Sequence, residues 1–168
     1  GAIAGAITNN GSLIFNRTGL STNNSTISGS GSLTKDGPGQ VNLDAHNSYS
    51  GATIVSGGIL AINGDSSTAT GGVTVSSGAA LAGSGTVGGQ TTIQSGAFHA
   101  PGSSPGLQTF ANGLTYEAGA TLVWELTTNA VATRGVNFDG VDVTGGVLTI
   151  ATGVTSSLIF DGVGSTVD

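Results

Sequence analysis

A glycine-centred turn between two short β-rich runs recurs along this chain and restricts its fold more than any other feature. The turn glycines are Gly57, Gly78, Gly96, Gly119 and Gly145, at intervals of 21, 18, 23 and 26 residues. Two earlier turns, at residues 11–13 and 31–33, lie 20 residues apart. A repeated two-strand unit with an irregular period of about 20 residues is typical of stacked solenoid coils, in which extra residues bulge outward at corners.

The residues between these turns favour strands over helices. Good helix formers are scarce, since Lys35 is the only lysine and Glu117 and Glu125 are the only glutamates. Thr, Val, Ile, Ser and Asn take their place, and these residues favour strands and turns. Hydrophobic residues make up 37% of the chain and recur in an ordered pattern, which argues against disorder.

Alternation within the runs predicts which side chains point inward. Two examples are the sets Leu33, Val41, Leu43 and Leu122, Trp124, Leu126. We therefore expect an all-β parallel β-helix of about seven irregular coils, filling residues 1–168 as a single segment. Many short strands with glycine turns also fit a sandwich or an antiparallel barrel.

The aromatic residues are mostly core candidates, and Trp124 is the best example because it shares parity with Leu122 and Leu126. The full set is Phe15, Tyr49, Phe98, Phe110, Tyr116, Trp124, Phe138 and Phe160.

The charge pattern argues against nucleic acid as a partner. The net charge is −6, and the three cations Arg17, Lys35 and Arg134 are far apart in the sequence. Phosphate neutralisation needs clustered basic residues, and an anionic membrane surface needs them as well. No apolar run approaches the roughly 20 residues of a membrane-spanning helix.

Two short motifs resemble active-site loops but lack the context that such loops need. Residues 102–106 match G-x-S-x-G, which would make Ser104 a nucleophile with His99 nearby as a base. Pro105 and the absence of a following helical pattern argue for a rigid corner loop instead. Residues 83–88 match G-x-G-x-x-G, but another β-rich run follows where dinucleotide binding requires a helix.

Other polar groups have structural interpretations too. Asp44, His46 and Ser48 suggest a triad, but they lie in a predicted turn. His46 and His99 fall in separate coils without cysteine, which makes a zinc site improbable. Asp139 and Asp142 offer too few oxygen ligands for calcium and are predicted to be corner residues.

We therefore expect no catalytic, cofactor-binding or metal-binding residues and no enzymatic activity. A carbohydrate-active enzyme remains a less favoured alternative, with Glu117 and Glu125 as an acid–base pair. Regular threonine arrays can match ice, but the threonine spacing changes from coil to coil, and we expect this change to disrupt a flat lattice.

Residues 31–60 resemble the passenger-associated repeat of bacterial autotransporters, and we assign the repeat to residues 29–60. The matching positions are Gly31, Leu33, Lys35, Gly37, Gly39, Val41, Leu43, Asn47, Tyr49, Ser50, Gly51, Thr53, Val55, Gly58 and Leu60. Three later stretches, 81–89, 100–106 and 142–145, are similar to further passenger sequences. The resemblance extends over about residues 29–150.

This resemblance implies a right-handed β-helix that is exported through the outer membrane and folds outside the cell. Such proteins carry a signal peptide and a C-terminal outer-membrane barrel, neither of which is recognisable here, so we expect a segment of a longer passenger. The implied function is a structural stalk that supports export and surface presentation, with the barrel of the same parent chain as partner. The alternative is an adhesin that binds identical passengers on neighbouring cells or a host surface.

Overall fold

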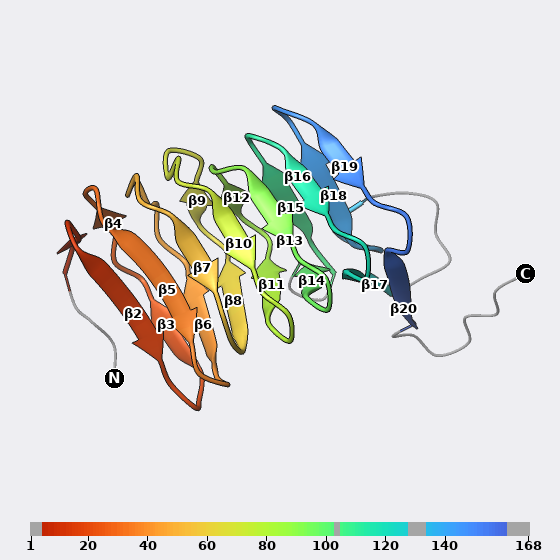
Figure 1. Cartoon of the computed structure of the whole chain (residues 1–168), viewed down its shortest axis with the longest axis horizontal. Helices are drawn as coiled ribbons and strands as arrows, with labels where there is room; N and C mark the ends of the chain where they lie inside the picture. The colour runs from red at the N-terminus through yellow and green to blue at the C-terminus, as the bar shows by residue number, and fades with distance from the viewer. Residues whose placement is uncertain (1–4, 103–104, 128–133, 161–168) are drawn as a thin grey trace, which may run out of the picture.

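The computed structural model describes residues 5–102, 105–127 and 134–160. Within these ranges the chain is all β, and Figure 1 shows its strands arranged as a solenoid. None of the described residues belongs to a helix that is long and apolar enough to cross a membrane.

Three stacked sheets form the faces of the solenoid. Sheet one consists of β2 (Ser12–Asn16), β5 (Ser32–Asp36), β7 (Thr53–Val55), β10 (Val73–Val75), β13 (Thr91–Ile93), β16 (Leu114–Tyr116) and β19 (Leu148–Ile150). Sheet two consists of β3 (Ser21–Asn23), β6 (Gln40–Leu43), β8 (Ile59–Ile62), β11 (Ala80–Gly83), β14 (Phe98–Pro101), β17 (Thr121–Leu126) and β20 (Thr155–Phe160). Sheet three consists of β9 (Asp65–Ser66), β12 (Thr86–Val87), β15 (Leu107–Phe110) and β18 (Gly140–Val143), and β1 (Ile7–Thr8) pairs with β4 (Ile27–Ser28).

The strands within each sheet are parallel neighbours from successive coils. β5, for example, lies between β2 and β7, and β11 lies between β8 and β14. Sheets one and two have seven strands each, which corresponds to six complete turns of the solenoid and the first two strands of a seventh turn. The solenoid prediction is confirmed. The sandwich and the antiparallel barrel are excluded because the named strands pair in parallel.

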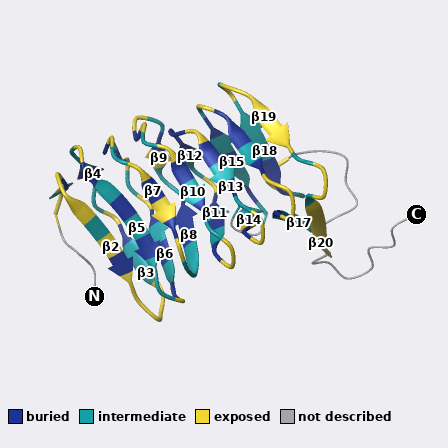
Figure 2. Cartoon of the chain, viewed as in Figure 1, coloured by how far each residue is buried: buried dark blue, intermediate teal, exposed yellow. Residues whose placement is uncertain are grey.

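The core consists of columns of inward side chains that repeat from coil to coil. In sheet one, the column Phe15, Lys35, Val55, Val75, Ile93, Tyr116 and Ile150 follows the strand register. Leu33, Val41 and Leu43 are fully buried, as the alternation predicts. Figure 2 shows buried residues through the middle coils and exposed ones on β19, where Ile150 is 61% exposed.

Some aromatic residues depart from the predicted core. Phe15, Tyr49, Phe110 and Tyr116 are buried as expected. Phe98 is wrongly predicted, since its side chain is 41% exposed on the outer face of β14. Trp124 and Phe138 are half-buried, and the side chain of Phe160 lies outside the described set.

Threonines align on the outer face of sheet one despite their unequal spacing in the sequence. Thr34, Thr74, Thr92, Thr115 and Thr149 share one column, which Ile14 and Ile54 complete. The threonines align even though their spacing in the sequence varies, because the extra residues are accommodated at the corners between strands. The alignment is a single column and not a two-dimensional array.

Candidate functional site

Lys35 is a fully buried cation within the apolar column of sheet one. Its Nζ donates to the carbonyl oxygens of Asp36 (3.0 Å), Gly37 (2.9 Å) and Gly57 (2.8 Å). A lysine ammonium has three hydrogens, so the three carbonyls satisfy it completely. Desolvation lowers the pKa of Lys35, and the nearby Asp36 carboxylate opposes that shift. Because Gly57 belongs to the following coil, this cation joins two coils through the backbone.

Glycine makes the corners of these coils narrow enough to stack. A Cβ at Gly58 would lie 2.2 Å from the Gly39 carbonyl oxygen and 2.8 Å from the Lys35 Nζ. Gly58 also has a φ of 62°, which side chains disfavour. At another corner, a Cβ at Gly71 would lie 2.0 Å from the carbonyl oxygen of Gly51. Backbone from neighbouring coils therefore occupies the space that side chains would need.

Asn47 is a fully buried amide that connects three successive coils. Its Oδ1 accepts a hydrogen bond from the Ile27 backbone N–H (3.0 Å). Its Nδ2 donates to the Ala45 carbonyl oxygen (2.9 Å) and to the Ser66 Oγ (3.1 Å). Since Ile27 lies one coil before and Ser66 one coil after, Asn47 fixes the alignment of this corner on both sides.

Tyr49 and Thr53 form another buried polar pair at the corner where the chain enters the next coil. Their hydroxyl oxygens are 2.7 Å apart, and the two residues are 3% and 1% exposed. Burial raises the pKa of Tyr49, so its hydroxyl stays neutral. This pair anchors the corner that leads into β7.

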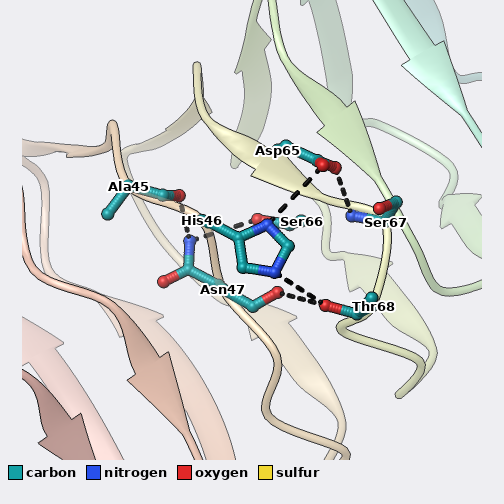
Figure 3. A network of polar contacts seen from close by, with 7 residues as sticks. All are labelled: Ala45, His46, Asn47, Asp65, Ser66, Ser67 and Thr68. Atoms are coloured by element: carbon teal, nitrogen blue, oxygen red, sulfur yellow. Dashed lines mark hydrogen bonds and ion pairs between the residues drawn. The ribbon is translucent and has the colours of Figure 1, made fainter.

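An exposed network lies over Asn47, as Figure 3 shows. The His46 Nδ1 is 3.5 Å from an Asp65 carboxylate oxygen, and the His46 Nε2 is 3.2 Å from the Thr68 hydroxyl. Thr68 also donates to the Asn47 carbonyl oxygen (3.1 Å), and the Ser67 N–H donates to Asp65 (2.9 Å). This backbone hydrogen bond is the main cause that lowers the pKa of Asp65.

The order carboxylate, imidazole, hydroxyl is that of a triad, but it differs from the triad suggested by sequence. Asp44 accepts a hydrogen bond from the Asn63 amide, and the partners of His46 are Asp65 and Thr68. The side chains of His46 and Asp65 are 52% and 58% exposed, so water surrounds the pair. A nucleophilic hydroxyl needs a dry site and a close base, whereas this arrangement connects two successive corners.

Another buried polar group, His99, lies farther along the solenoid. The Gln108 Nε2 donates to the Ala82 carbonyl oxygen (2.9 Å), which turns the Gln108 Oε1 toward the His99 Nε2 (2.8 Å). That nitrogen therefore carries the imidazole proton, and the His99 Nδ1 accepts from the Tyr116 hydroxyl (2.5 Å). We call this series, Tyr116 to His99 to Gln108 to Ala82, the His99 chain.

Burial determines the protonation states in the His99 chain. His99 and Gln108 are fully buried, and Tyr116 is 2% exposed. Desolvation lowers the pKa of His99 to about 4 and raises the pKa of Tyr116 well above its usual value. Phe110 packs edge-on against the imidazole, with ring centroids 5.4 Å apart. His99 is thus a neutral core group, and sequence alone had placed it beside a corner.

The acidic residues considered for calcium have separate partners. Asp139 is 1% exposed, and its carboxylate accepts from the backbone N–H groups of Gly106 (2.9 Å) and Glu125 (2.7 Å). Burial raises the pKa of Asp139. Asp142 pairs with Arg134 at 2.6 Å. Among the described residues, no group of three His, Asp or Glu side chains is placed to hold a metal ion.

The remaining predicted sites are dispersed. Ser104 lies outside the described residues, and residues 83–88 run from β11 into β12 without a helix. Glu117 follows β16 and lies near the Ser95 N–H at 3.4 Å. Glu125 lies beside Asp139 in a recess of about 210 Å³ over β11 and β14. Of the cations, Lys35 is buried and Arg134 is paired, so they form no basic surface with Arg17.

Comparison with known proteins identifies the coil that holds Lys35 and Asn47. Residues 33–62 match the passenger-associated-transport-repeat family. The chain is 49% identical over 90 residues to the "Adhesin BmaC autotransporter" of Brucella suis biovar 1 (strain 1330). That match covers 53% of this chain but only 3% of the relative, so the chain spans a small fraction of that protein. Residues 33–62 thus form a passenger-associated transport repeat, and the two comparisons together support an autotransporter passenger.

Proposed function

We propose that these coils are a structural stalk and folding segment of an autotransporter passenger, supporting its export and surface presentation. The observation that carries this proposal is the location of the repeat's polar residues. Lys35, Asn47 and Thr53 are at most 1% exposed, and the first two bond to neighbouring coils. Residues buried in this way cannot recognise an external ligand, but they can align one coil on the next.

Alignment of coils gives the stalk a mechanism. Each coil presents backbone edges and buried polar groups that the next coil completes, so folding propagates along the axis. Such growth outside the cell favours outward movement of the chain and holds a distal activity away from the membrane. On this account the outer-membrane barrel of the parent chain is the partner, and the cell surface is the location.

Surface display of the parent protein tests the proposal. We expect deletion of residues 29–150 to reduce the display of the passenger upstream of them, measured by its accessibility to external protease. Normal display of the deletion variant would contradict an export role.

A matched pair of point variants separates stacking from other effects of deletion. Lys35→Ala removes the cation that joins two coils, whereas Thr34→Ala changes an outward neighbour on the same strand. We expect reduced display for Lys35→Ala and normal display for Thr34→Ala. Equal display of both variants would show that coil stacking here does not limit export.

Adhesion is the second candidate function. It is supported by the name of the adhesin relative and by the outward column of Thr34, Thr74, Thr92 and Thr115 on sheet one. This column offers hydroxyl and methyl groups along one face, suited to many weak contacts. If adhesion uses this face, the substitutions Thr74→Lys and Thr92→Lys should reduce cell–cell aggregation or host attachment without affecting display. Unchanged attachment would exclude the face.

A further inference from the structure

The His99 chain suggests a property of the rod that is separate from its role as a stalk. We propose that the stack from β11 to β17 is an acid-sensitive joint, in which protonation of His99 breaks a hydrogen-bond chain and loosens these coils while the repeat coil stays folded. The proposal goes beyond the proposed function, because it specifies where the rod opens first and what causes the opening.

The His99 chain accommodates only one arrangement of its protons. Ala82 orients the Gln108 amide, Gln108 accepts the proton of the His99 Nε2, and the His99 Nδ1 accepts the Tyr116 proton. A second imidazole proton on Nδ1 would point at the Tyr116 hydroxyl. Tyr116 would then have to rotate and direct its own proton away from its acceptor inside the core. Protonation therefore costs hydrogen bonds as well as solvation.

The described surroundings of His99 offer no charge that would stabilise an imidazolium. Along sheet two, His99 lies between Leu81 of β11 and Leu122 of β17. β15 contributes Gln108 and the Phe110 ring, and β16 contributes Tyr116. Tyr116 is the titratable group in contact with His99, and burial keeps it neutral. A buried charge without a partner strongly destabilises the fold that contains it.

The direction of the pH effect follows from the ordinary and folded pKa values. Because the pKa of His99 is lowered from 6.5 to about 4, the unfolded state binds the proton more readily. The contribution of neutral His99 to stability is therefore fully present above pH 6.5 and is lost as the pH falls toward 4. The raised pKa of Asp139 has the opposite sign, since its protonation favours the folded state.

The repeat coil should not share this response. Burial lowers the pKa of Lys35, but its Nζ donates to three backbone carbonyl oxygens, which stabilise the protonated form. His46 in the same region is exposed. Acid should thus act on β14–β16 before it acts on residues 33–62.

Hydrogen exchange followed by mass spectrometry tests the joint on the whole chain between pH 7.5 and 4.5, with correction for the intrinsic exchange rate. We expect the protection of residues 94–126 to fall by about tenfold or more as the pH drops below 6.5, while residues 33–62 keep theirs. His99→Gln retains a donor and an acceptor but does not titrate, so it should lose the acid response. His46→Gln is the control and should behave like the unsubstituted chain.

Three results would overturn the proposal. They are an acid response that persists in His99→Gln, no response in the unsubstituted chain, and earlier opening at residues 33–62. If His99→Gln does not fold, NMR of the unsubstituted chain gives an independent answer. At pH 5.5 the folded chain should show His99 as the neutral tautomer with the proton on Nε2, and an imidazolium in the folded state would contradict the joint.

Discussion

Two buried polar centres of the solenoid, at Lys35 and at His99, satisfy their groups in different ways. The repeat coil buries a charge, Lys35, and surrounds it with three backbone carbonyls. The later coils bury a neutral group, His99, within a chain of side-chain hydrogen bonds. The lysine depends on backbone that any residue supplies, whereas the histidine depends on two other side chains. The repeat centre should therefore tolerate acid, and the His99 chain should not.

The difference also shows why only one centre lies in a recognisable motif. A carbonyl cage needs one lysine and the tight glycine corner that brings Gly57 and Gly58 to it. These residues lie within one coil and the following turn, so they form a local sequence pattern. The His99 chain joins residues of three strands to the Ala82 backbone, and its members share no fixed spacing.

The largest effect should come from Lys35→Ala. The variant opens a cavity in the sheet-one column and removes the Nζ donor of three partly buried carbonyl oxygens, so we expect a loss of about 4 kcal/mol of unfolding free energy. Urea unfolding followed by circular dichroism measures it. Thr34→Ala is the control and should stay within about 0.5 kcal/mol of the unsubstituted chain. A loss below about 1 kcal/mol for Lys35→Ala would mean that the cage contributes little.

Close stacking of the corners should have the next largest effect. Gly71→Ala places a Cβ 2.0 Å from the Gly51 carbonyl oxygen, whereas a Cβ at Gly72 finds its nearest atom, the Gln90 carbonyl oxygen, at 3.7 Å. We expect Gly71→Ala to cost about 3 kcal/mol because the coils must separate, and Gly72→Ala to cost less than about 1 kcal/mol. Equal losses in the two variants, measured by thermal unfolding, would contradict the stacking geometry.

The acid response of the His99 chain should reach a similar size. A pKa lowered from 6.5 to about 4 corresponds to a loss of about 3 kcal/mol as the pH falls through that range. Urea unfolding at pH 7 and pH 4.5, compared between the unsubstituted chain and His99→Gln, isolates this contribution. The unfolding free energy should change more with pH in the unsubstituted chain than in His99→Gln. An equal change in both would contradict the acid sensitivity that distinguishes the His99 chain from the Lys35 centre.

The tyrosines allow a smaller, matched comparison. Tyr116→Phe leaves the His99 Nδ1 without its donor, and Tyr49→Phe leaves the Thr53 hydroxyl without its partner. Each should cost about 1–2 kcal/mol in chemical denaturation. Only Tyr116→Phe should change the pH dependence between pH 7 and 4.5, because only Tyr116 contacts a titrating group. A changed pH profile in Tyr49→Phe would count against this assignment.

The smallest effect should come from the exposed network over Asn47. His46→Ala removes contacts with Asp65 and Thr68 that are surrounded by water, so we expect a change within about 0.5 kcal/mol. Asn47→Ala, directly beneath it, removes the three hydrogen bonds of a buried amide and should cost several times more. If His46→Ala lowered the unfolding free energy as much as Asn47→Ala, the structural role at this corner would have been assigned to the wrong residue.

The strand pattern could be read from the sequence because alternation and glycine turns are local signals. Leu33, Val41 and Leu43 are buried as predicted, and Gly78, Gly96 and Gly119 have φ values of 80°, 75° and 84°. Sheet three was less accessible to prediction, because strands as short as Asp65–Ser66 and Thr86–Val87 carry no alternation. The partners of His46 were missed because Asp65 and Thr68 lie one coil later.

The error at β14 has a simple physical origin. Hydrophobicity alone places Phe98 inside and His99 outside, but strand register fixes the opposite parity. Phe98 pairs with Ala80 and Thr121, and His99 pairs with Leu81 and Leu122. Alignment of the turns at Gly78, Gly96 and Gly119 would have put His99 in the leucine column. The repeat alignment therefore predicts the correct side for both residues, whereas residue type alone predicts the wrong one.

Hydrogen exchange on the Lys35→Met variant tests most directly whether the repeat's polar residues join neighbouring coils. Met restores much of the volume but cannot donate to the Gly57 carbonyl oxygen. We predict lost protection both in the Lys35 coil at residues 33–43 and in the following coil at residues 53–62, with residues 107–116 unchanged. Unchanged protection at 53–62, or a loss confined to the strand that carries the substitution, would contradict a role for Lys35 in stacking one coil on the next.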